Sequence, residues 1–265
     1  MDAADISHAG MALAYAMLLI PLVIMQWRAV ALRRRTLVAA LRMSLQLLFV
    51  ALYLELIFRL QSALLTGLWL AVMLVVADVS IVRACSLRLR RVGPPLLVGL
   101  GLGTLVPLAL FVWGVLARPG SFDPRYVIPI GGMILGNCLR ADIVGLNTCF
   151  DRLRRDRKAY EQVLGWGATR QEALGPYFSH ALRAALAPTI ATMATIGLVS
   201  LPGMMTGVIL GGTDPTTAVK YQIAIMCAIF AGTALTVTTV IALATRRAID
   251  DYGNLDPRVF TDTSG

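Results

Sequence analysis

The chain has 265 residues, of which 57% are apolar and 15% are charged, and its mean hydropathy is +0.73. Soluble proteins contain about 45–50% apolar and about 25% charged residues, so this composition excludes an ordinary soluble domain. The net charge of +9 is compatible with nucleic-acid binding. However, the basic residues lie between apolar blocks, which favours a membrane protein without a nucleic-acid partner.

Seven apolar blocks are long enough to cross a bilayer, which requires about 20 residues in a helix. The predicted spans are residues 9–27, 36–58, 63–82, 94–117, 126–150, 184–210 and 221–245. The first block is expected to be a retained helix rather than a signal peptide, because acidic residues and no basic segment precede it. We therefore expect an all-α, polytopic membrane protein with about seven transmembrane helices and a single transmembrane domain over residues 1–265.

The basic residues divide unequally between the two sides of the predicted membrane. The loops after spans one, three, five and seven carry 18 of the 24 Lys and Arg residues, and the loops on the other side carry four. Cytoplasmic loops are enriched in Lys and Arg. This asymmetry predicts an N-terminus outside and a C-terminus in the cytoplasm. The expected location of the protein is the cell's inner (plasma) membrane.

A few charged and polar residues fall inside the predicted spans, where they are costly and usually paired or functional. Arg42 and Asp78 lie at similar depths in spans two and three, so we expect an ion pair between antiparallel neighbours, either structural or lining a path. Gln46 lies one turn from Arg42 on the same helix face. Glu55, Asp78 and Asp142 are all candidates for attracting a cation, and the sequence does not choose among them.

The longest stretch between spans, residues 151–183, is too short for an independent hydrophobic core. Any catalytic or energy-using domain must therefore be another polypeptide. The stretch begins as a charged helix that is expected to extend span five as far as Leu164. Gly165 and Gly167 then break this helix, with Trp166 between them.

A second, short helix is predicted directly after the glycine break. Thr169 is followed three residues later by Glu172, which forms the capping-box pattern T-x-x-E. Gly175–Pro176 is expected to end this helix. The whole loop is then either a solvated hairpin or, because it exposes apolar groups, a docking surface for another protein.

Glycine and proline patterns on both sides of the loop carry information on helix packing. Gly132–Gly136 and Gly203–Gly207 are G-x-x-x-G patterns, which favour close helix contacts in lipid. Pro202–Gly203 is predicted to break span six, and broken helices can line a cavity. Met204 and Met205 follow this break, but thioethers prefer softer ions than Fe(II), so packing is their default role and the metal ligands stay unknown.

The sequence from Glu161 resembles the EAA-type loop of ABC transporter permeases. Glu161 and Gly167 have the required spacing, whereas Gln162 and Val163 replace the usual alanines. The flanking stretches P-I-G-G-M-I-L-G-N and G-L-V-S-L-P-G-M-M-T-G-V-I-L-G-G-T-D-P extend the likeness. Together they resemble the FetB-type family of ABC permeases, which includes a bacterial iron-export permease and plant relatives tied to aluminium tolerance. The resemblance is strong over residues 129–247 and weaker before residue 117.

The resemblance implies a permease subunit that exports iron or another metal ion by using ATP hydrolysed by a separate ATPase. The loop at residues 151–183 would then be the coupling loop, with its short helix in a cleft of the ATPase. The implied coupling residues are Glu161, Gly165, Trp166, Gly167, Ala168, Thr169 and Glu172. Candidates for the translocation path are Arg42, Gln46, Asp78, Asn137, Met204 and Met205.

The expected partners follow from what one chain lacks. No G-x-x-x-x-G-K-[ST] phosphate loop occurs, so ATP and Mg would be bound by the partner ATPase and not by this chain. One chain offers half a pathway, which favours a homodimer surrounded by membrane lipid. A stand-alone ion channel or ion-coupled carrier is the alternative. A membrane enzyme is disfavoured, because only two histidines and no nucleophile motif are present.

Overall fold

The computed structural model describes residues 7–116, 123–250 and 253–261, and the regular elements in these ranges are helices. The chain folds into two compact units. The first contains Met1–Gln61 and Leu210–Thr213, and the second contains Ser62–Ile209 and Asp214–Gly265. The single domain expected over residues 1–265 stays a prediction.

The first unit contains α1 (His8–Ala16), α2 (Leu19–Trp27) and α3 (Arg33–Leu60). Ser7 caps α1 by accepting a hydrogen bond from the Gly10 N–H at 3.2 Å. The Tyr15 hydroxyl on α1 lies 2.6 Å from the Ser44 hydroxyl on α3. No residue of α1 or α2 is buried, as expected for helices whose apolar side chains face lipid.

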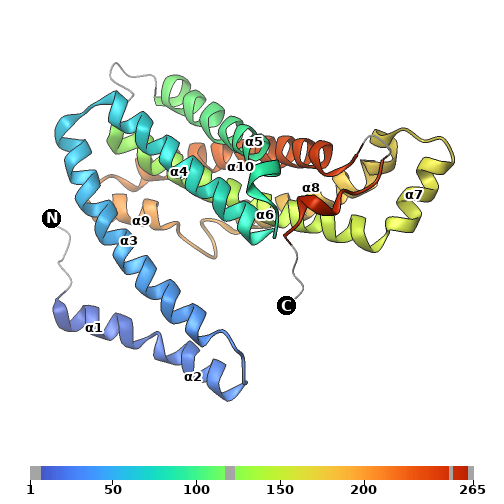
Figure 1. Ribbon diagram of the computed structural model, residues 1–265. Coiled ribbons are helices and arrows are strands. Elements are labelled where there is room, and N and C mark those ends of the chain that lie inside the picture. The colour runs from blue at the N-terminus through green and yellow to red at the C-terminus, as the bar shows by residue number, and fades with distance from the viewer. Residues whose placement is uncertain (1–6, 117–122, 251–252, 262–265) are drawn as a thin grey trace. The chain divides into compact units, whose positions relative to one another are not determined.

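The second unit is a bundle in which α4, α5, α6 and α10 pack side by side, with α7 at one end (Figure 1). Its helices are α4 (Ala63–Ala84), α5 (Leu89–Ala109), α6 (Pro124–Arg155), α7 (Arg157–Gly165), α8 (Arg170–Thr195), α9 (Gly203–Leu210) and α10 (Pro215–Ala248). A π-helical segment, Leu110–Leu116, extends α5.

Two of the long helices begin with the same local signal, an aspartate followed by a proline. Asp123 precedes α6 and accepts the Arg125 N–H at 2.9 Å. Asp214 precedes α10 and accepts the Thr217 N–H at 3.2 Å. The proline after each aspartate has no N–H to satisfy in the first turn, so it costs the helix nothing there.

Glycines allow α5 and α10 to approach until their backbones touch. A Cβ atom at Gly232 would lie 2.5 Å from the Gly103 carbonyl oxygen, and a Cβ atom at Gly99 would lie 2.7 Å from Val240. Gly99 and Gly103 form a further G-x-x-x-G pattern, outside the two that were predicted to pack. At three of the four predicted packing glycines, Gly136, Gly203 and Gly207, no described atom lies within 4 Å of an added Cβ. At the fourth, Gly132, an added Cβ would lie 3.2 Å from the Met73 side chain, so within the described part of one chain Gly132 alone of the four has a close neighbour.

The packing contacts also define helix directions. Along α6 and α10 the contacting residue numbers rise together: Ile134 lies beside Gly232, and the Asp142 carboxylate accepts a 2.8 Å hydrogen bond from the Thr236 hydroxyl. Gly145 then lies beside Ile241. These two helices are therefore parallel, and the chain between them returns along the bundle.

Six helical stretches among the described residues are long and apolar enough to cross a membrane. They are His8–Trp27, Arg33–Leu60, Ala63–Ala84, Leu89–Leu116, Pro124–Arg155 and Pro215–Ala248. The predicted span at residues 184–210 is not among them, because α8 ends at Thr195 and α9 begins only at Gly203. The break is thus wider than the expected Pro202–Gly203 step. Gly197 turns the chain within it at φ +88°.

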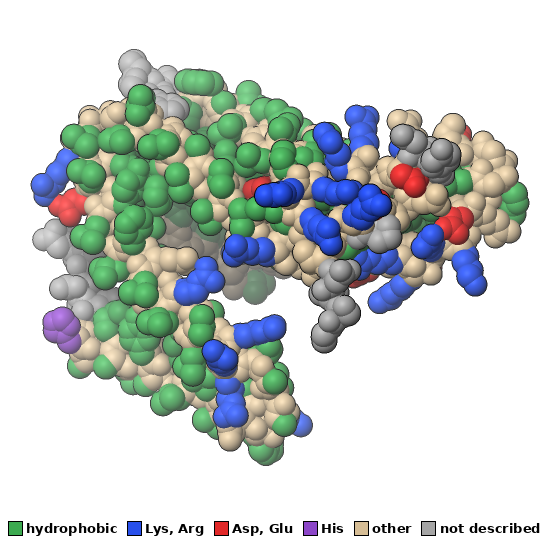
Figure 2. Space-filling model, in the orientation of Figure 1, with side chains coloured by type: hydrophobic (Ala, Val, Ile, Leu, Met, Phe, Trp, Pro, Cys, Tyr) green, Lys and Arg blue, Asp and Glu red, His purple; other side chains and the backbone are tan. Residues whose placement is uncertain are grey.

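Side-chain type varies over the surface of the second unit. Hydrophobic side chains cover the view of α4 and α5, whereas Lys and Arg side chains gather toward the end that carries α7 (Figure 2). Exposed basic residues at that end include Arg88, Arg90, Arg91, Arg154 and Arg155.

Candidate functional site

The first candidate site is a hairpin formed by α7, the turn at residues 166–169 and the start of α8. α7 is a separate helix, because the backbone turns at Asp156, where φ is −97° and ψ is 20°. The predicted helical extension of span five is confirmed as far as Arg155, but its unbroken continuation to Leu164 is wrong. An ion pair of 2.6 Å between Arg157 and Glu161 lies along the exposed side of α7.

The turn presents a tryptophan to the outside of the hairpin. Trp166 is 77% exposed, and it follows the last residue of α7, Gly165. Gly167 has φ +92°, a left-handed conformation that side chains disfavour, and its N–H bonds the Leu164 carbonyl at 2.9 Å. The predicted glycine break is confirmed.

The predicted capping box at the start of α8 is also confirmed. The Thr169 hydroxyl accepts the Glu172 N–H at 3.3 Å, and the Glu172 carboxylate accepts the Thr169 N–H at 2.8 Å. The carboxylate also accepts the Thr169 hydroxyl at 2.7 Å. The hydrogen bond from the Thr169 hydroxyl has the larger effect and the bond from the Thr169 N–H the smaller, and together they hold the pKa of Glu172 below its usual range.

The predicted end of this helix at Gly175–Pro176 is wrong, because α8 continues to Thr195. Pro176 costs the helix one backbone hydrogen bond, but the face that carries Tyr177, Ala181 and Ala185 is buried. α8 packs extensively on α6, so tertiary burial outweighs the local proline signal.

The inner side of the hairpin is held by aromatic packing and by the C-terminal segment, residues 253–261. Tyr160 of α7 packs edge-to-face on Tyr177 of α8, with ring centroids 6.2 Å apart, and burial raises the pKa of both hydroxyls. A Cβ at Gly253 would lie 2.7 Å from the Leu164 side chain. The Arg170 guanidinium donates to the Asp250 carbonyl at 2.8 Å. The hairpin therefore has a supported inner face and an open outer face at Trp166.

The same C-terminal segment also contacts α5 and α6. Phe260 packs edge-to-face on Phe150 at a centroid distance of 5.4 Å, and the Arg154 guanidinium lies 3.7 Å from its ring centroid. Arg91 pairs with Asp256 at 2.5 Å. The hydrogen bond from the Arg258 N–H has the largest effect on Asp256, and together with Arg91 it holds the pKa of this carboxyl below its usual range. The segment thus links the hairpin to the ends of two long helices, which no spacing in the sequence indicated.

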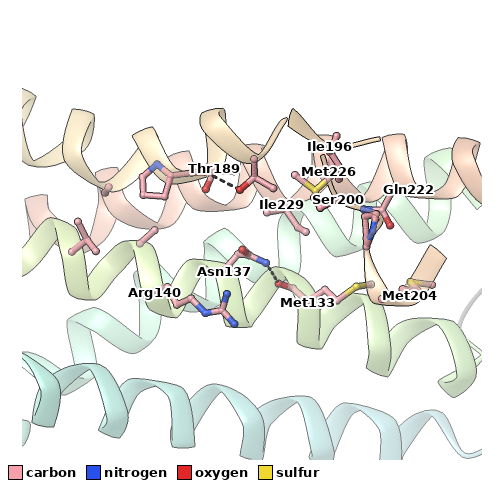
Figure 3. A pocket seen from close by; sticks show the side chains of 17 residues that line it. Met133, Asn137, Arg140, Thr189, Ile196, Ser200, Met204, Gln222, Met226 and Ile229 are labelled. Carbon is pink, nitrogen blue, oxygen red and sulfur yellow. Dashed lines mark hydrogen bonds between the residues drawn. The ribbon is translucent and has the colours of Figure 1, made fainter. Parts of the chain in front are cut away.

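The second candidate site is a cavity of about 510 Å³ between α6, α8, the 196–202 break and α10 (Figure 3). Its polar and sulfur-containing lining residues are Met133, Asn137, Arg140, Thr189, Thr192, Ser200, Met204, Gln222 and Met226. The Asn137 amide donates to the Met133 carbonyl at 2.8 Å, which orients its side chain along α6. Of the predicted path residues, the structure brings Asn137 and Met204 together here.

The other predicted path residues do not line this cavity. Met205 is half-buried on α9 but is not part of the wall. Asp78 is buried on α4, and Arg42 and Gln46 are exposed on α3, in the other compact unit. The ion pair between Arg42 and Asp78 therefore stays a prediction. Asp142 is fully buried against α10 rather than in the cavity.

Two wall residues were missed as site candidates by sequence reasoning. Arg140 is a charge inside predicted span five, residues 126–150, and it lies midway along α6, whose bounds are Pro124–Arg155. Nothing in the sequence indicated that Gln222 lines a cavity, because a single glutamine in a long apolar helix does not show which helix face is turned toward a cavity. No group of three His, Cys, Asp or Glu side chains that could hold a metal ion occurs among residues 7–116, 123–250 and 253–261.

Several known proteins are similar to this chain, two of them over more than four fifths of its length. The uncharacterised protein family UPF0014 matches residues 8–249. A UPF0014 membrane protein of Synechocystis is 33% identical over 232 residues, covering 88% of this chain and 90% of that protein. The probable iron export permease protein FetB of Escherichia coli is 32% identical over 223 residues, covering 84% and 85%. Protein ALUMINUM SENSITIVE 3 of Arabidopsis thaliana is 37% identical over 124 residues, covering 47% and 44%. No solved structure matches the chain.

Proposed function

The chain belongs to the UPF0014 family of membrane proteins, and from this premise we propose that it is the permease subunit of an ABC transporter that exports iron or another metal ion. ATP and Mg are bound by a separate ATPase subunit, and this chain is not itself an enzyme. The family match and the name of the similar FetB protein support transport as the function.

The observation that carries the proposal is the hairpin. Its inner face is fastened by Tyr160, Tyr177 and the C-terminal segment, while Trp166 is left 77% exposed at the tip. A large exposed aromatic side chain on a hydrogen-bonded, capped turn is suited to a docking contact. The ATPase partner docks here, against Trp166, Ala168, Thr169 and Glu172, with Glu161, Gly165 and Gly167 shaping the turn.

The sidedness of the permease follows from helix direction and charge. Because α6 and α10 are parallel, the intervening chain has to return across the membrane between them. We assign this crossing to α8 and α9, a seventh span interrupted at residues 196–202. Seven crossings place the N-terminus outside and place the hairpin and C-terminus in the cytoplasm, where basic residues concentrate. The membrane is the inner (plasma) membrane of the cell.

The transporter is a homodimer of this chain with its ATPase subunits. Gly132 and Gly136 lie on α6, and the position of a Cβ at Gly136 is open within one described chain. A second permease copy would occupy such open small-residue surfaces, as helices do in lipid.

The test compares two equally exposed tryptophans. Trp166 and Trp27 are 77% and 78% exposed, and the second lies outside the hairpin. In proteoliposomes with the cognate ATPase, Trp166→Ala should weaken ATPase binding about 30-fold, the effect of losing roughly 2 kcal/mol at an interface hot spot. Trp27→Ala should leave ATPase binding and ATP hydrolysis unchanged.

Two results would count against this function. One is equal ATPase binding by both variants and the wild type, which would remove the docking role of the hairpin. The other is metal transport at the full rate in liposomes that contain this chain without any ATPase, which would favour a channel or an ion-coupled carrier.

A further inference from the structure

The cavity wall formed by α6 carries a polar and charged stripe. Met133, Asn137 and Arg140 are spaced by four and three residues, so they lie on one helix face. Figure 3 shows their side chains along this wall, with Thr189 and Gln222 on the surrounding helices. Arg140 lies at one end of this wall, where its side chain is exposed in the described chain, and Gln222 lies toward the other end.

The charge of the cavity is positive. Among the described residues that form the wall, Arg140 is the single charged side chain, and Asp, Glu, His and Cys are absent. No carboxylate in the described part of the chain forms a salt bridge with Arg140. Its guanidinium therefore contributes a full charge to the cavity.

An arginine without a salt bridge is unusual in the middle of a membrane-spanning helix, because burying its charge in lipid costs free energy. Arg140 lies at the middle of a helix long enough to span the membrane, where an unpaired charge is expensive and is kept for a ligand, a partner or a water-filled path. The guanidinium group suits planar oxyanions, because it offers parallel N–H donors to a carboxylate or phosphate. A bare divalent cation would instead meet charge repulsion, and no oxygen-anion ligand would compensate for it.

We propose that this cavity binds an oxyanion-bearing ligand through Arg140, so that the transported metal enters it as an anionic chelate and not as a free cation. The inference rests on the proposed transport function and narrows its substrate class. Asn137, one turn from Arg140 on α6, supplies a neutral polar group near the guanidinium, and Gln222 supplies another toward the far end of the cavity. Met133, Met204 and Met226 supply an adaptable apolar wall on the same cavity.

The experiment measures binding to the full chain alone, in nanodiscs of phosphatidylcholine. The probes are iron(III)–citrate, citrate without metal, and Fe²⁺ kept reduced without chelator. We expect iron(III)–citrate to bind at least tenfold more tightly than free Fe²⁺. Arg140→Gln should weaken binding of both citrate probes at least tenfold, and Arg140→Lys should restore part of it.

Two further variants separate a site effect from misfolding and from general electrostatics. Arg155→Gln removes the same charge from the same helix outside this cavity, and it should leave citrate binding within twofold of wild type. Ser200→Asp adds a negative charge at an exposed position of the cavity wall, where the side chain makes no described hydrogen bond. It should weaken citrate binding and strengthen Fe²⁺ binding. Thermal melting of each variant in detergent verifies folding.

Clear results would overturn the proposal. Fe²⁺ binding tighter than either citrate probe, or equal effects of Arg140→Gln and Arg155→Gln, would exclude an anion site at Arg140. A second arm adds phosphatidylglycerol to the nanodiscs. Arg140-dependent enrichment of this lipid, with no citrate binding in phosphatidylcholine, would assign the cavity to a lipid headgroup and overturn the substrate assignment.

The outcome is independent of the ATPase test. Citrate binding that depends on Arg140 would stand even if Trp166→Ala left coupling unchanged. Tight binding of free Fe²⁺ would defeat the anion site and leave the ATPase docking proposal intact.

Discussion

At the scale of single residues, Thr169 and Glu172 stabilise the hairpin where α8 begins. Their two backbone hydrogen bonds close the first turn of α8 immediately after the exposed turn. Thr169→Ala should destabilise this turn by about 1 kcal/mol, as loss of a threonine N-cap does. Hydrogen exchange of the α8 amides measures the effect. Gln171→Ala, in the same exposed turn but outside the capping box, should leave exchange unchanged.

The same capping box makes the hairpin sensitive to acid. The pKa of Glu172 in the folded chain is below its ordinary value of 4.5, so the folded state favours the charged carboxylate. Its stabilising contribution is complete above pH 4.5 and is lost as the pH falls through the folded-state pKa. We expect faster amide exchange at the start of α8 below that pH. An unchanged acid response in Glu172→Gln would show that another group is responsible.

At the scale of helices, the contact between α5 and α10 depends on the absence of side chains. A Cβ at Gly103 would meet the Thr236 Cβ and would lie 2.9 Å from both the Gly232 carbonyl oxygen and the Thr236 Cα, so backbone atoms would have to shift. Gly103→Ala should therefore destabilise the bundle by about 1–3 kcal/mol through overpacking. Gly101→Ala is the matched control on the same helix, because nothing described lies within 4 Å of its added Cβ. Thermal melting in detergent compares them, and equal melting temperatures would contradict this packing.

The C-terminal segment is the second helix-scale feature, because it joins the hairpin to α5 and α6. Phe260→Ala removes the ring that contacts both Phe150 and Arg154, and we expect a loss of about 3 kcal/mol in the local stability of residues 253–261. Limited proteolysis of this segment reports the change. Arg258→Ala, at an exposed neighbouring position, should leave cleavage unchanged. Equal cleavage of Phe260→Ala and wild type would show that the ring does not anchor the segment.

At the scale of the whole molecule, the number of crossings can be read from the two ends of the chain. With Cys227 replaced by Ser, Ser7→Cys should react with a membrane-impermeant maleimide in intact cells. Thr261→Cys should react only after permeabilisation, because seven crossings place the ends on opposite sides. Labelling of both positions from the same side would show six crossings, with α8 and α9 not spanning the membrane.

Local signals in the sequence predicted local structure well. The capping box at Thr169 and the glycine break at Gly167 depend on atoms within one turn, and both are present. The prediction failed where packing competes with a local signal. Pro176 predicts the end of a helix, but α8 continues beyond it because burial of Tyr177 and its neighbours stabilises the helix. The break near Pro202 was found, yet its true width from Ile196 depends on the surrounding helices.

The sequence by itself determined that this is a helical membrane protein, that its basic residues are asymmetric, and that a capped turn exposes Trp166. These properties follow from composition and from neighbours along the chain. Only the tertiary structure decided which glycines meet, through Gly103 and Gly232, and that Arg140 shares a cavity with Gln222. The physical reason is that these contacts join residues far apart in the sequence, where helix direction and rotation, rather than local spacing, set the distances.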